Sequence, residues 1–276
     1  MAATAPRGSV AVLGAAGRMG CAIIRVISEL PDLKLTAAVE HDKSDKLGQN
    51  AAQVAQVASP GAGGDGVKIA AGVPAPGVAA VWIDFSSPEA TARHAAAAAA
   101  AGAALVVGTT GVTAEGKEAL TTAARTVPVV FAPNTSVGVT VLLRLCAEAA
   151  RLLGPGFDLE IVETHHRRKR DAPSGTALRL AEAVAEATGR DLSKDARMVR
   201  QGDVGPRTSR EIGIQTLRGG DVVGDHTVFF LGDGERVEIT HRASSRETFA
   251  RGALRAALWV VGQPPGLYDM RAVLGL

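Results

Sequence analysis

The sequence predicts an α/β protein whose first half builds a parallel sheet and whose second half is an α+β region. In the first half, short apolar runs alternate with helical patterns, which is typical of βαβ units. In the second half, several strand patterns follow one another after a helix. Only 3% of the 276 residues are aromatic while 46% are hydrophobic, so the core must pack small aliphatic side chains on regular elements.

Five apolar runs in the first half are expected to be buried strands, with helices between them. The strands are expected at Val10–Leu13, Lys34–Glu40, Ala79–Phe85, Ala103–Val107 and Val127–Ala132, and the helices at Arg18–Leu30, Pro88–Ala101 and Ala114–Arg125. Ser86, followed three residues later by Glu89, is a capping-box pattern that favours a helix start. Residues 43–78 are richer in Gly, Pro, Gln and Ser, and we expect a loose excursion there with one short strand at Val67–Ala70.

The second half is expected to begin with a long helix and to continue as a mixed, largely antiparallel sheet. Helices are expected at Val137–Leu153 and Ser174–Thr188, and strands at Leu159–Thr164, Glu211–Leu217, Thr227–Leu231 and Arg236–Thr240. Asp233 and Gly234 between the last two strands predict a tight hairpin. The amphipathic helix at Glu247–Val261 is expected to return to the first sheet.

Charge and cysteine content narrow the class of protein. The sequence has 30 Lys and Arg against 28 Asp and Glu, so its net charge of +2 does not favour a polyanion partner. The shortage of aromatic side chains also argues against a nucleic-acid surface built on stacking. Cys21 and Cys146 are isolated thiols in apolar surroundings, which favours reduced cysteines and a cytoplasmic protein. The uncharged stretch from Ala95 to Ala114 is interrupted by glycines, so we expect no membrane span.

A glycine-containing turn follows the first expected strand and opens the first helix. Its residues are Gly14, Ala15, Ala16, Gly17, Arg18, Met19 and Gly20. Glycines there allow the backbone to approach a pyrophosphate at the helix N-terminus, and Glu40, 20 residues after Gly20, is placed to hold ribose hydroxyls. An ordinary strand-to-helix turn is the competing interpretation, since Ala16 replaces the middle glycine of the usual pattern. No Gly-Lys-Ser/Thr follows, which disfavours an ATP-binding loop.

Two further loops follow expected strands and are candidates for the nicotinamide half of a dinucleotide. They contain Gly108, Thr109 and Thr110 in the first loop and Ala132, Pro133, Asn134 and Thr135 in the second. In open α/β sheets ligands bind at the carboxyl ends of the strands, where both loops are expected. Each loop alone is more often a plain turn, so their joint position carries the argument.

The segment from Glu163 to Ala177 is the most informative part of the chain. A run of imidazole and cationic side chains, His165 to Arg170, follows a strand and precedes a Pro-Ser-Gly-Thr helix start. The hydroxyls and N–H groups of Ser174, Gly175 and Thr176 suit a carboxylate or phosphate, and Lys169 suits a second anionic group. The segment therefore predicts a pocket for a small molecule with two acidic groups.

Other interpretations of this segment remain open from the residues alone. The basic run is also compatible with a solvated loop or a nucleic-acid patch, and His165 and His166 with packing residues. Zinc is disfavoured, because adjacent histidines diverge and no further ligand set is present, so we expect no metal. Acid/base chemistry by one histidine is favoured, since its ordinary pKa lies near neutrality.

These motifs closely resemble the dihydrodipicolinate reductase family over nearly the whole chain. The resemblance is carried by the turn at 10–20, by 163–177, by Gly219 to His226, by Glu238 to Arg246 and by Leu267 to Arg271. It implies a Rossmann-like dinucleotide-binding domain at 1–133 and 246–276, and a substrate-binding and tetramerisation domain at 134–245. It also implies NADH- or NADPH-dependent reduction of a cyclic dicarboxylic imine, 4-hydroxy-tetrahydrodipicolinate, in the diaminopimelate route to lysine.

The resemblance also implies roles for individual residues. His165 matches the family's proton donor and Lys169 its second catalytic residue. The matching substrate positions are His166, Lys169, Ser174, Gly175 and Thr176, and the matching cofactor positions are residues 14–20, Glu40, His41, 108–110 and 132–135. A homotetramer is implied as well.

Two points qualify the resemblance. Some members have Arg after the ribose-binding acid where this chain has His41, which predicts use of both cofactors without a strong NADPH preference. Lys43 and Arg18 are candidates to compensate. The alternative functions are another two-domain NAD(P)-dependent dehydrogenase of an amino or oxo dicarboxylate, and a non-catalytic dinucleotide sensor.

Overall fold

The computed structural model describes residues 8–58 and 66–276, and the chain divides into two compact units. The first unit comprises Met1–Val137 and Arg246–Leu276, and the second comprises Gly138–Ser245. Residues 134–137, which we expected in the second unit, belong to the first. There the Thr135 hydroxyl donates to the carbonyl of Phe249 at 2.7 Å.

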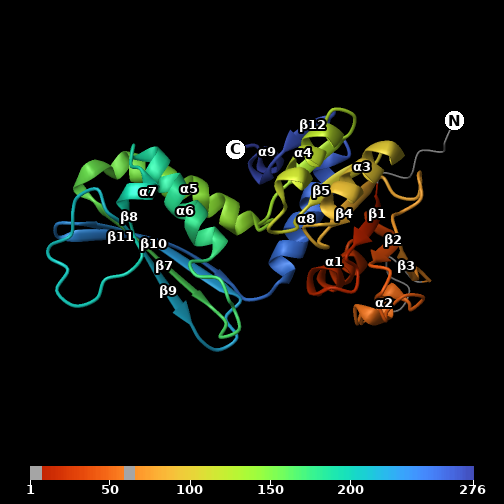
Figure 1. Ribbon diagram of the computed structural model, residues 1–276, viewed down its shortest axis with the longest axis horizontal. Coiled ribbons are helices and arrows are strands. Elements are labelled where there is room, and N and C mark those ends of the chain that lie inside the picture. The colour runs from red at the N-terminus through yellow and green to blue at the C-terminus, as the bar shows by residue number, and fades with distance from the viewer. Residues whose placement is uncertain (1–7, 59–65) are drawn as a thin grey trace. The chain divides into compact units, whose positions relative to one another are not determined.

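The first unit is built on a seven-stranded sheet in which every pairing is parallel (Figure 1). Its strands are β1 (Ser9–Leu13), β2 (Lys34–Glu40), β3 (Ile69–Ala71), β4 (Val81–Asp84), β5 (Ala104–Val107), β6 (Pro128–Phe131) and β12 (Gly266–Tyr268). They lie in the order β12-β6-β5-β4-β1-β2-β3. The predicted parallel sheet is therefore confirmed, and the short edge strand β12 was not predicted.

Helices cover both faces of this sheet. They are α1 (Arg18–Glu29), α2 (Ala51–Val54), α3 (Thr91–Ala101), α4 (Ala114–Ala123), α8 (Glu247–Val260) and α9 (Met270–Leu274). Apolar residues of α1, α8 and α9 share one core cluster with the sheet, and residues of α3 and α4 share a second cluster. The expected return of the last long helix to the first sheet is thus confirmed. Part of the 43–78 excursion, residues 59–65, lies outside the described residues.

The capping box expected at Ser86 is wrong. Helix α3 begins only at Thr91, with Ala90 as its N-cap residue. The Ser86 hydroxyl instead donates to Oδ1 of Asp84 at 2.5 Å. Asp84 is fully buried at the end of β4, so its carboxylate needs local donors more than the helix start needs Ser86.

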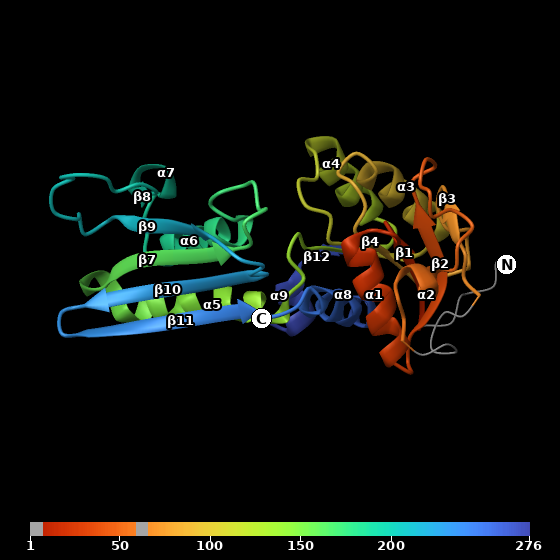
Figure 2. The same cartoon turned by 90° about the horizontal axis from the view of Figure 1, so that it is seen from below.

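The second unit is built on a mixed sheet with two helices on one face (Figure 2). Its strands are β7 (Asp158–His165), β8 (Ala196–Arg197), β9 (Ile212–Arg218), β10 (Gly224–Gly232) and β11 (Glu235–Ala243), in the order β11-β10-β7-β9-β8. Its helices are α5 (Val137–Leu153), η1 (Gly154–Gly156), α6 (Gly175–Ala187) and α7 (Leu192–Asp195). Helices α5 and α6 pack on β7, β9 and β10 through one apolar cluster.

The mixed character of this sheet follows from its connections. The hairpin at Asp233 and Gly234 is confirmed, and it makes β10 and β11 antiparallel, as β10 and β7 are. The chain from β7 to β9 runs through α6 as a crossover, so β7 and β9 are parallel, and β8 joins β9 in parallel. The antiparallel part is therefore confined to β7, β10 and β11.

The glycine turn between β1 and α1 is closed by short contacts. Gly14 has a φ of +79°, and the N–H groups of Gly14 and Ala15 both donate to the carbonyl of Val39. A Cβ on Gly20 would lie 2.1 Å from the Gly14 carbonyl oxygen. The third glycine of the turn thus allows the helix to pack directly on the loop before it.

We expect Gly20→Ala to destabilise the first unit by about 1–3 kcal/mol, because the added methyl group collides with backbone. Trp82 and Trp259 both belong to this unit, so urea unfolding followed by tryptophan fluorescence measures its stability. Gly262→Ala is the matched control, since its Cβ would lie 3.9 Å from the nearest atom. Equal midpoints for the two variants would contradict the packing argument.

Candidate active site

The candidate active site lies where the helix-covered face of the second sheet changes from apolar to polar. Along β7, alternation places Glu163 and His165 on the same face as the buried Leu159 and Ile161. On β9, the same face carries the apolar Ile212 and Ile214 and then the polar Thr216 and Arg218. At the start of β10, Gly224 and His226 lie on this face as well. One end of the core face is therefore a polar cluster drawn from three neighbouring strands.

The carboxylate of Glu163 is the centre of this cluster. Its side chain is fully buried and receives hydrogen bonds from His165 Nδ1 at 2.6 Å and from the Ser174 backbone N–H at 2.9 Å. Arg218 donates to both carboxylate oxygens, at 2.7 and 2.8 Å. The hydroxyl of Thr216 donates at 3.2 Å. These bonds outweigh the cost of burial and lower the pKa of Glu163 to about 2.

The Glu163 carboxylate fixes the tautomer and the direction of His165. An ionised carboxylate only accepts, so Nδ1 of His165 carries a proton and Nε2 is the nitrogen left for exchange with a ligand. Nε2 lies against Gly224, where a Cβ would come within 2.9 Å. The ring meets that of His226 edge to face, with centroids 5.1 Å apart. Gly224 therefore leaves room for this ring orientation.

Burial lowers the pKa of His165 below its ordinary value of 6.5, and the charges of Lys169 and Arg218 act in the same direction. The hydrogen bond and charge of Glu163 oppose this shift. His226 is more deeply buried, and burial together with the nearby His165 lowers its pKa to about 3. At neutral pH His226 is thus a neutral partner, with Nε2 3.0 Å from the Ser174 hydroxyl.

The N-terminus of α6 adjoins this cluster. Ser174 is the N-cap residue, and its hydroxyl accepts from the N–H of Ala177 at 3.2 Å. Gly175 and Thr176 form the first turn of the helix. Because Glu163 binds both the Ser174 N–H and His165, the structure brings the predicted anion site and the predicted acid/base residue together.

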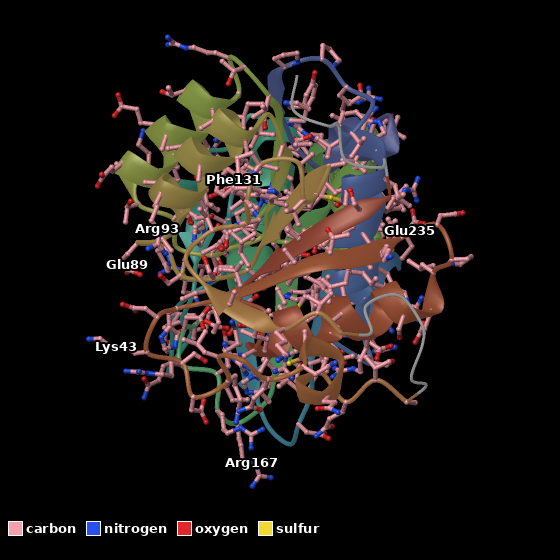
Figure 3. All side chains as sticks on the ribbon, turned by 90° about the vertical axis from the view of Figure 1, so that its right-hand side faces the viewer. Lys43, Glu89, Arg93, Phe131, Arg167 and Glu235 are labelled. Atoms are coloured by element: carbon pink, nitrogen blue, oxygen red, sulfur yellow. The ribbon has the colours of Figure 1, made fainter. Side chains whose placement is uncertain are left out.

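In the loop before α6, Lys169 is partly buried, whereas the neighbouring arginines are exposed. Lys169 forms an ion pair with Asp171 at 2.9 Å and is only 20% exposed, and Arg218 donates to the Asp171 carbonyl. Arg167, Arg168 and Arg170 are exposed, and Figure 3 shows Arg167 pointing away from its unit. Of the lysine and arginine side chains between 167 and 170, Lys169 is therefore the one that lies close enough to influence His165. His166 donates its backbone N–H to Val222, and its Nδ1 is buried with no hydrogen-bond partner among the described residues.

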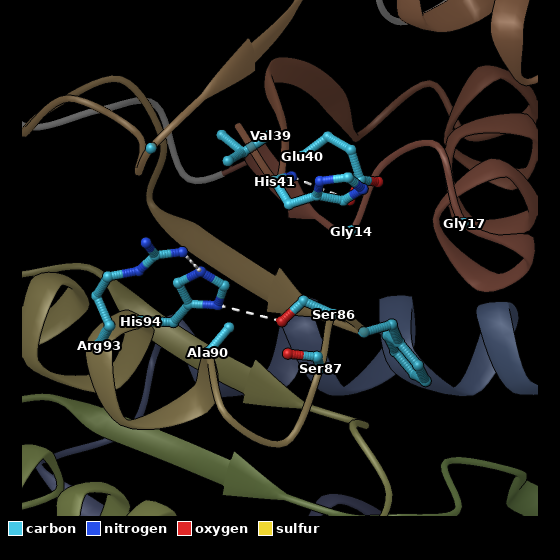
Figure 4. A pocket seen from close by; sticks show the side chains of 12 residues that line it. Gly14, Gly17, Val39, Glu40, His41, Ser86, Ser87, Ala90, Arg93 and His94 are labelled. Carbon is cyan, nitrogen blue, oxygen red and sulfur yellow. Dashed lines mark hydrogen bonds between the residues drawn. The ribbon is translucent and has the colours of Figure 1, made fainter. Parts of the chain in front are cut away.

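The first unit contains a separate cavity of about 360 Å³ at the carboxyl ends of its strands (Figure 4). Four of the predicted cofactor residues, Gly14, Gly17, Glu40 and His41, line it. The remaining lining residues are Val39, Gly72, Phe85, Ser86, Ser87, Ala90, Arg93 and His94. Gly14 and Gly17 present bare backbone to this space, as a dinucleotide phosphate requires, so the residues present fit a dinucleotide.

Glu40 also stabilises the glycine turn from the far side of the cavity. Its Oε2 accepts from the N–H of Ala16 at 3.0 Å, and its Oε1 accepts from the N–H of His41 at 3.1 Å. Each carboxylate oxygen keeps acceptor capacity for a hydroxyl group. The position is therefore compatible with the ribose contact expected from the sequence.

Other predicted cofactor residues are not in this cavity. They are Ala15, Ala16, Arg18, Met19, Gly20, Gly108, Thr109, Thr110, Ala132, Pro133, Asn134 and Thr135. The Thr109 hydroxyl contacts Asp84 at 3.3 Å, and Asn134 Oδ1 accepts from the N–H of Ser136. Gly108 is required locally, because a Cβ would overlap the ring of Phe85.

Sequence reasoning assigned no role to several residues of the two sites. In the second unit these are Glu163, Thr216, Arg218, Gly224 and His226. Glu163 could have been found from the sequence, because it is a charged residue at a position of β7 where the alternation predicts a buried side chain. In the first unit, Asp84, Arg93 and His94 were not singled out.

Two family models match the chain, one for each region. Residues 8–135 match "Dihydrodipicolinate reductase, N-terminus", and residues 138–274 match "Dihydrodipicolinate reductase, C-terminus". The chain belongs to the dihydrodipicolinate reductase family.

Named relatives agree with this assignment, and one solved structure shares the fold. The chain is 56% identical over 269 residues to the 4-hydroxy-tetrahydrodipicolinate reductase of Anaeromyxobacter dehalogenans (strain 2CP-1 / ATCC BAA-258), covering 97% of each chain. It is 52% identical over 268 residues to that of Syntrophotalea carbinolica, covering 97% of this chain and 98% of the other. The dipicolinate-bound dihydrodipicolinate reductase from Paenisporosarcina sp. TG-14 shares the fold, with a TM-score of 0.70, 21% identity, and coverage of 95% and 97%.

The family assignment makes the chain an oxidoreductase of the diaminopimelate and lysine pathway. Its activity is the reduction of 4-hydroxy-tetrahydrodipicolinate with NADH or NADPH, and its first unit is the dinucleotide-binding domain. Within residues 8–58 and 66–276, no helix has the length and hydropathy to cross a membrane.

The depressed pKa of Glu163 predicts a loss of stability in acid. Its ordinary pKa is 4.5 and the folded value is about 2, so its contribution, about 3 kcal/mol, is fully present above pH 4.5 and is lost as pH falls toward 2. We expect Glu163→Gln to be less stable at neutral pH and to lack this pH-dependent loss. Urea unfolding followed by circular dichroism between pH 2.5 and 7 measures both effects.

Glu235→Gln, on the exposed hairpin of the same unit, is the matched control. It should retain the acid-dependent loss of the unmodified protein. Parallel stability curves for Glu163→Gln and the unmodified protein would exclude Glu163 as its source.

Proposed function

We propose that the polar end of the second sheet binds the dicarboxylic substrate and supplies the proton for its reduction, with His165 as the proton donor. The single observation that carries this proposal is the Glu163–His165 pair beside the N-terminus of α6. It combines a histidine of fixed tautomer with a helix end suited to a carboxylate. The sequence segment from 163 to 177 supports the same assignment.

Substrate binding follows from the charges at this end of the sheet. One carboxylate docks on the N–H groups of Gly175 and Thr176 and on the hydroxyls of Ser174 and Thr176, while the Ser174 N–H stays bonded to Glu163. The second carboxylate is attracted by Lys169, whose ammonium is held at the site by Asp171. When the substrate carboxylate takes over part of the contact that Lys169 makes with Asp171, the substrate ring is positioned beside His165. His166 is the further substrate position that the family resemblance implies.

Proton transfer uses Nε2 of His165. When bound, NADH or NADPH supplies the hydride that adds to the conjugated ring at the carbon losing its hydroxyl as water. His165 provides the balancing proton from Nε2, and Glu163 stabilises the imidazolium form before transfer through the hydrogen bond to Nδ1. Lys169 stabilises negative charge that develops on the substrate during the reaction.

Assembly and cellular location complete the proposal. We propose a cytoplasmic homotetramer formed through the second unit. The family resemblance supports this assembly. The free state of Cys21 and Cys146 supports a reducing compartment.

Substitution of the two proposed catalytic residues tests the assignment. We expect His165→Ala to lower kcat by about 10²- to 10⁴-fold, as loss of a general acid does. Lys169→Ala is expected to lower kcat by roughly 10²-fold through lost charge stabilisation. NADPH binding, measured by calorimetry, is expected to persist in both variants. Arg167→Ala is the control for loss of a neighbouring exposed cation and should stay within about twofold. Unchanged turnover in either catalytic variant would reject its role.

The lowered pKa of His165 predicts the pH dependence. A proton donor is active in its protonated form, so kcat/KM is expected to fall with rising pH, and the midpoint is expected below 6.5. The limb in kcat is expected at higher pH, because the bound carboxylates favour the imidazolium. Initial rates between pH 5 and 9 measure both limbs. A single limb above pH 7.5 in kcat/KM would contradict His165 as the donor.

A further inference from the structure

The cavity of the first unit contains a permanent cation that the sequence motifs did not reveal. Arg93, on the first turn of α3, lies on one wall, and Glu40 and His41 lie on the other (Figure 4). The guanidinium of arginine stays protonated at any physiological pH, whereas an imidazole is only partly charged near neutrality. Arg93 is therefore the dependable positive charge of this cavity, among the described residues that line it.

Two buried residues hold Arg93 in this position. Arg93 Nη2 lies 3.4 Å from His94 Nε2, and His94 Nδ1 lies 2.9 Å from Asp84 Oδ2. A guanidinium can only donate, so His94 Nε2 accepts and Nδ1 carries the proton that is donated to Asp84. Asp84 is fully buried and His94 is 3% exposed. A chain of hydrogen bonds thus links the buried Asp84 through His94 to Arg93 at the cavity.

The rest of the guanidinium is left for a ligand. Among the described residues, His94 is the hydrogen-bond partner of Arg93. A guanidinium has five N–H groups arranged as a fork that matches a phosphate group. One N–H is occupied by His94, and the exposed side chain offers the others.

A positive charge is needed here for one of the two cofactors. Glu40, on the opposite wall, favours ribose hydroxyls and repels a phosphate on the same ribose. His41, the residue after Glu40, also lines the cavity, and an imidazole is not a permanent cation. Lys43, the compensating residue considered from the sequence, is not among the residues that line the cavity.

We propose that Arg93 binds the adenosine 2′-phosphate of NADPH, and that Asp84 and His94 are the residues that position it. The proposal deepens the assigned cofactor site and rests on that site binding the adenosine half of the dinucleotide. It places the charge that accepts NADPH on α3, across the cavity from the ribose-binding acid. Arg93 is thus a specificity residue, without a part in hydride or proton transfer.

Two nucleotides that differ only in this phosphate test the proposal. The probes are 2′,5′-ADP and 5′-AMP, and calorimetry gives their Kd values at 0.02 and 0.15 M salt. We expect Arg93→Ala to weaken 2′,5′-ADP about tenfold, as loss of a charge-assisted phosphate contact does, and to leave 5′-AMP within about twofold. Arg93→Lys should fall between, because it keeps the charge without the fork.

Lys117→Ala is the matched control, since it removes one exposed positive charge from α4, in the same unit but outside the cavity. It should change the two Kd values by similar, small factors that disappear at 0.15 M salt. His94→Leu tests positioning and is expected to reproduce the selective loss in part. Tryptophan fluorescence shows whether this variant is folded, and Arg93→Ala tests the proposal independently of it.

Three results would overturn the proposal. Equal weakening of both nucleotides by Arg93→Ala would mean that Arg93 contacts the adenine or supports the wall. No effect on 2′,5′-ADP would remove Arg93 from the site. Failure of the unmodified protein to bind either nucleotide would instead refute the cofactor site itself, whatever the role of Arg93.

Discussion

The buried carboxylate of Glu163 is the interaction on which the second unit depends. A charge without water is stable only if donors surround it, and here they come from β7, β9 and the N–H of the N-cap residue of α6. Arg218 lies 55 positions further along the chain, so this carboxylate ties together parts that sequence separates. The same bonds that offset its burial also orient His165. Stability and chemistry at this place therefore share one group.

The strand alternation explains why a polar cluster can exist inside an apolar layer. Residues two apart share a face, so Ile161, Glu163 and His165 form one row that leaves the core as the helix above it ends. Where α6 stops covering the sheet, its N-terminus supplies N–H groups in place of methyl groups. The transition from core to site thus occurs within two residues of one strand.

The periodicity of apolar residues in the sequence predicted most of the helices and strands, but it predicted fewer of the residues in the two sites. The helix at 137–153 and the strand at 34–40 coincide with their predicted bounds because their patterns are long. The short edge strand β12 has too few residues to show a pattern. The capping prediction at Ser86 failed because a buried carboxylate competes for the hydroxyl, and burial depends on the whole sheet.

The positioning residues were harder to predict than the residues they position. His165 and Ser174 lie in a recognisable motif, whereas the role of Arg218 depends on the parallel register of β7 and β9. In the sequence, Arg93 resembles any exposed helix residue, and only the three-dimensional structure shows that it lines a cavity. Tertiary pairing creates these roles, so no local pattern carries them.

The two-segment make-up of the first unit has a consequence for synthesis on the ribosome. Its core is completed by Ala253, Leu254 and Ala257 of α8, which leave the ribosome only after the whole second unit. The second unit is one continuous segment and can fold as soon as it emerges. Until then only part of that face of the nascent first sheet is covered, by α1, so its apolar strands stay open to chaperones and to aggregation while the second unit is made.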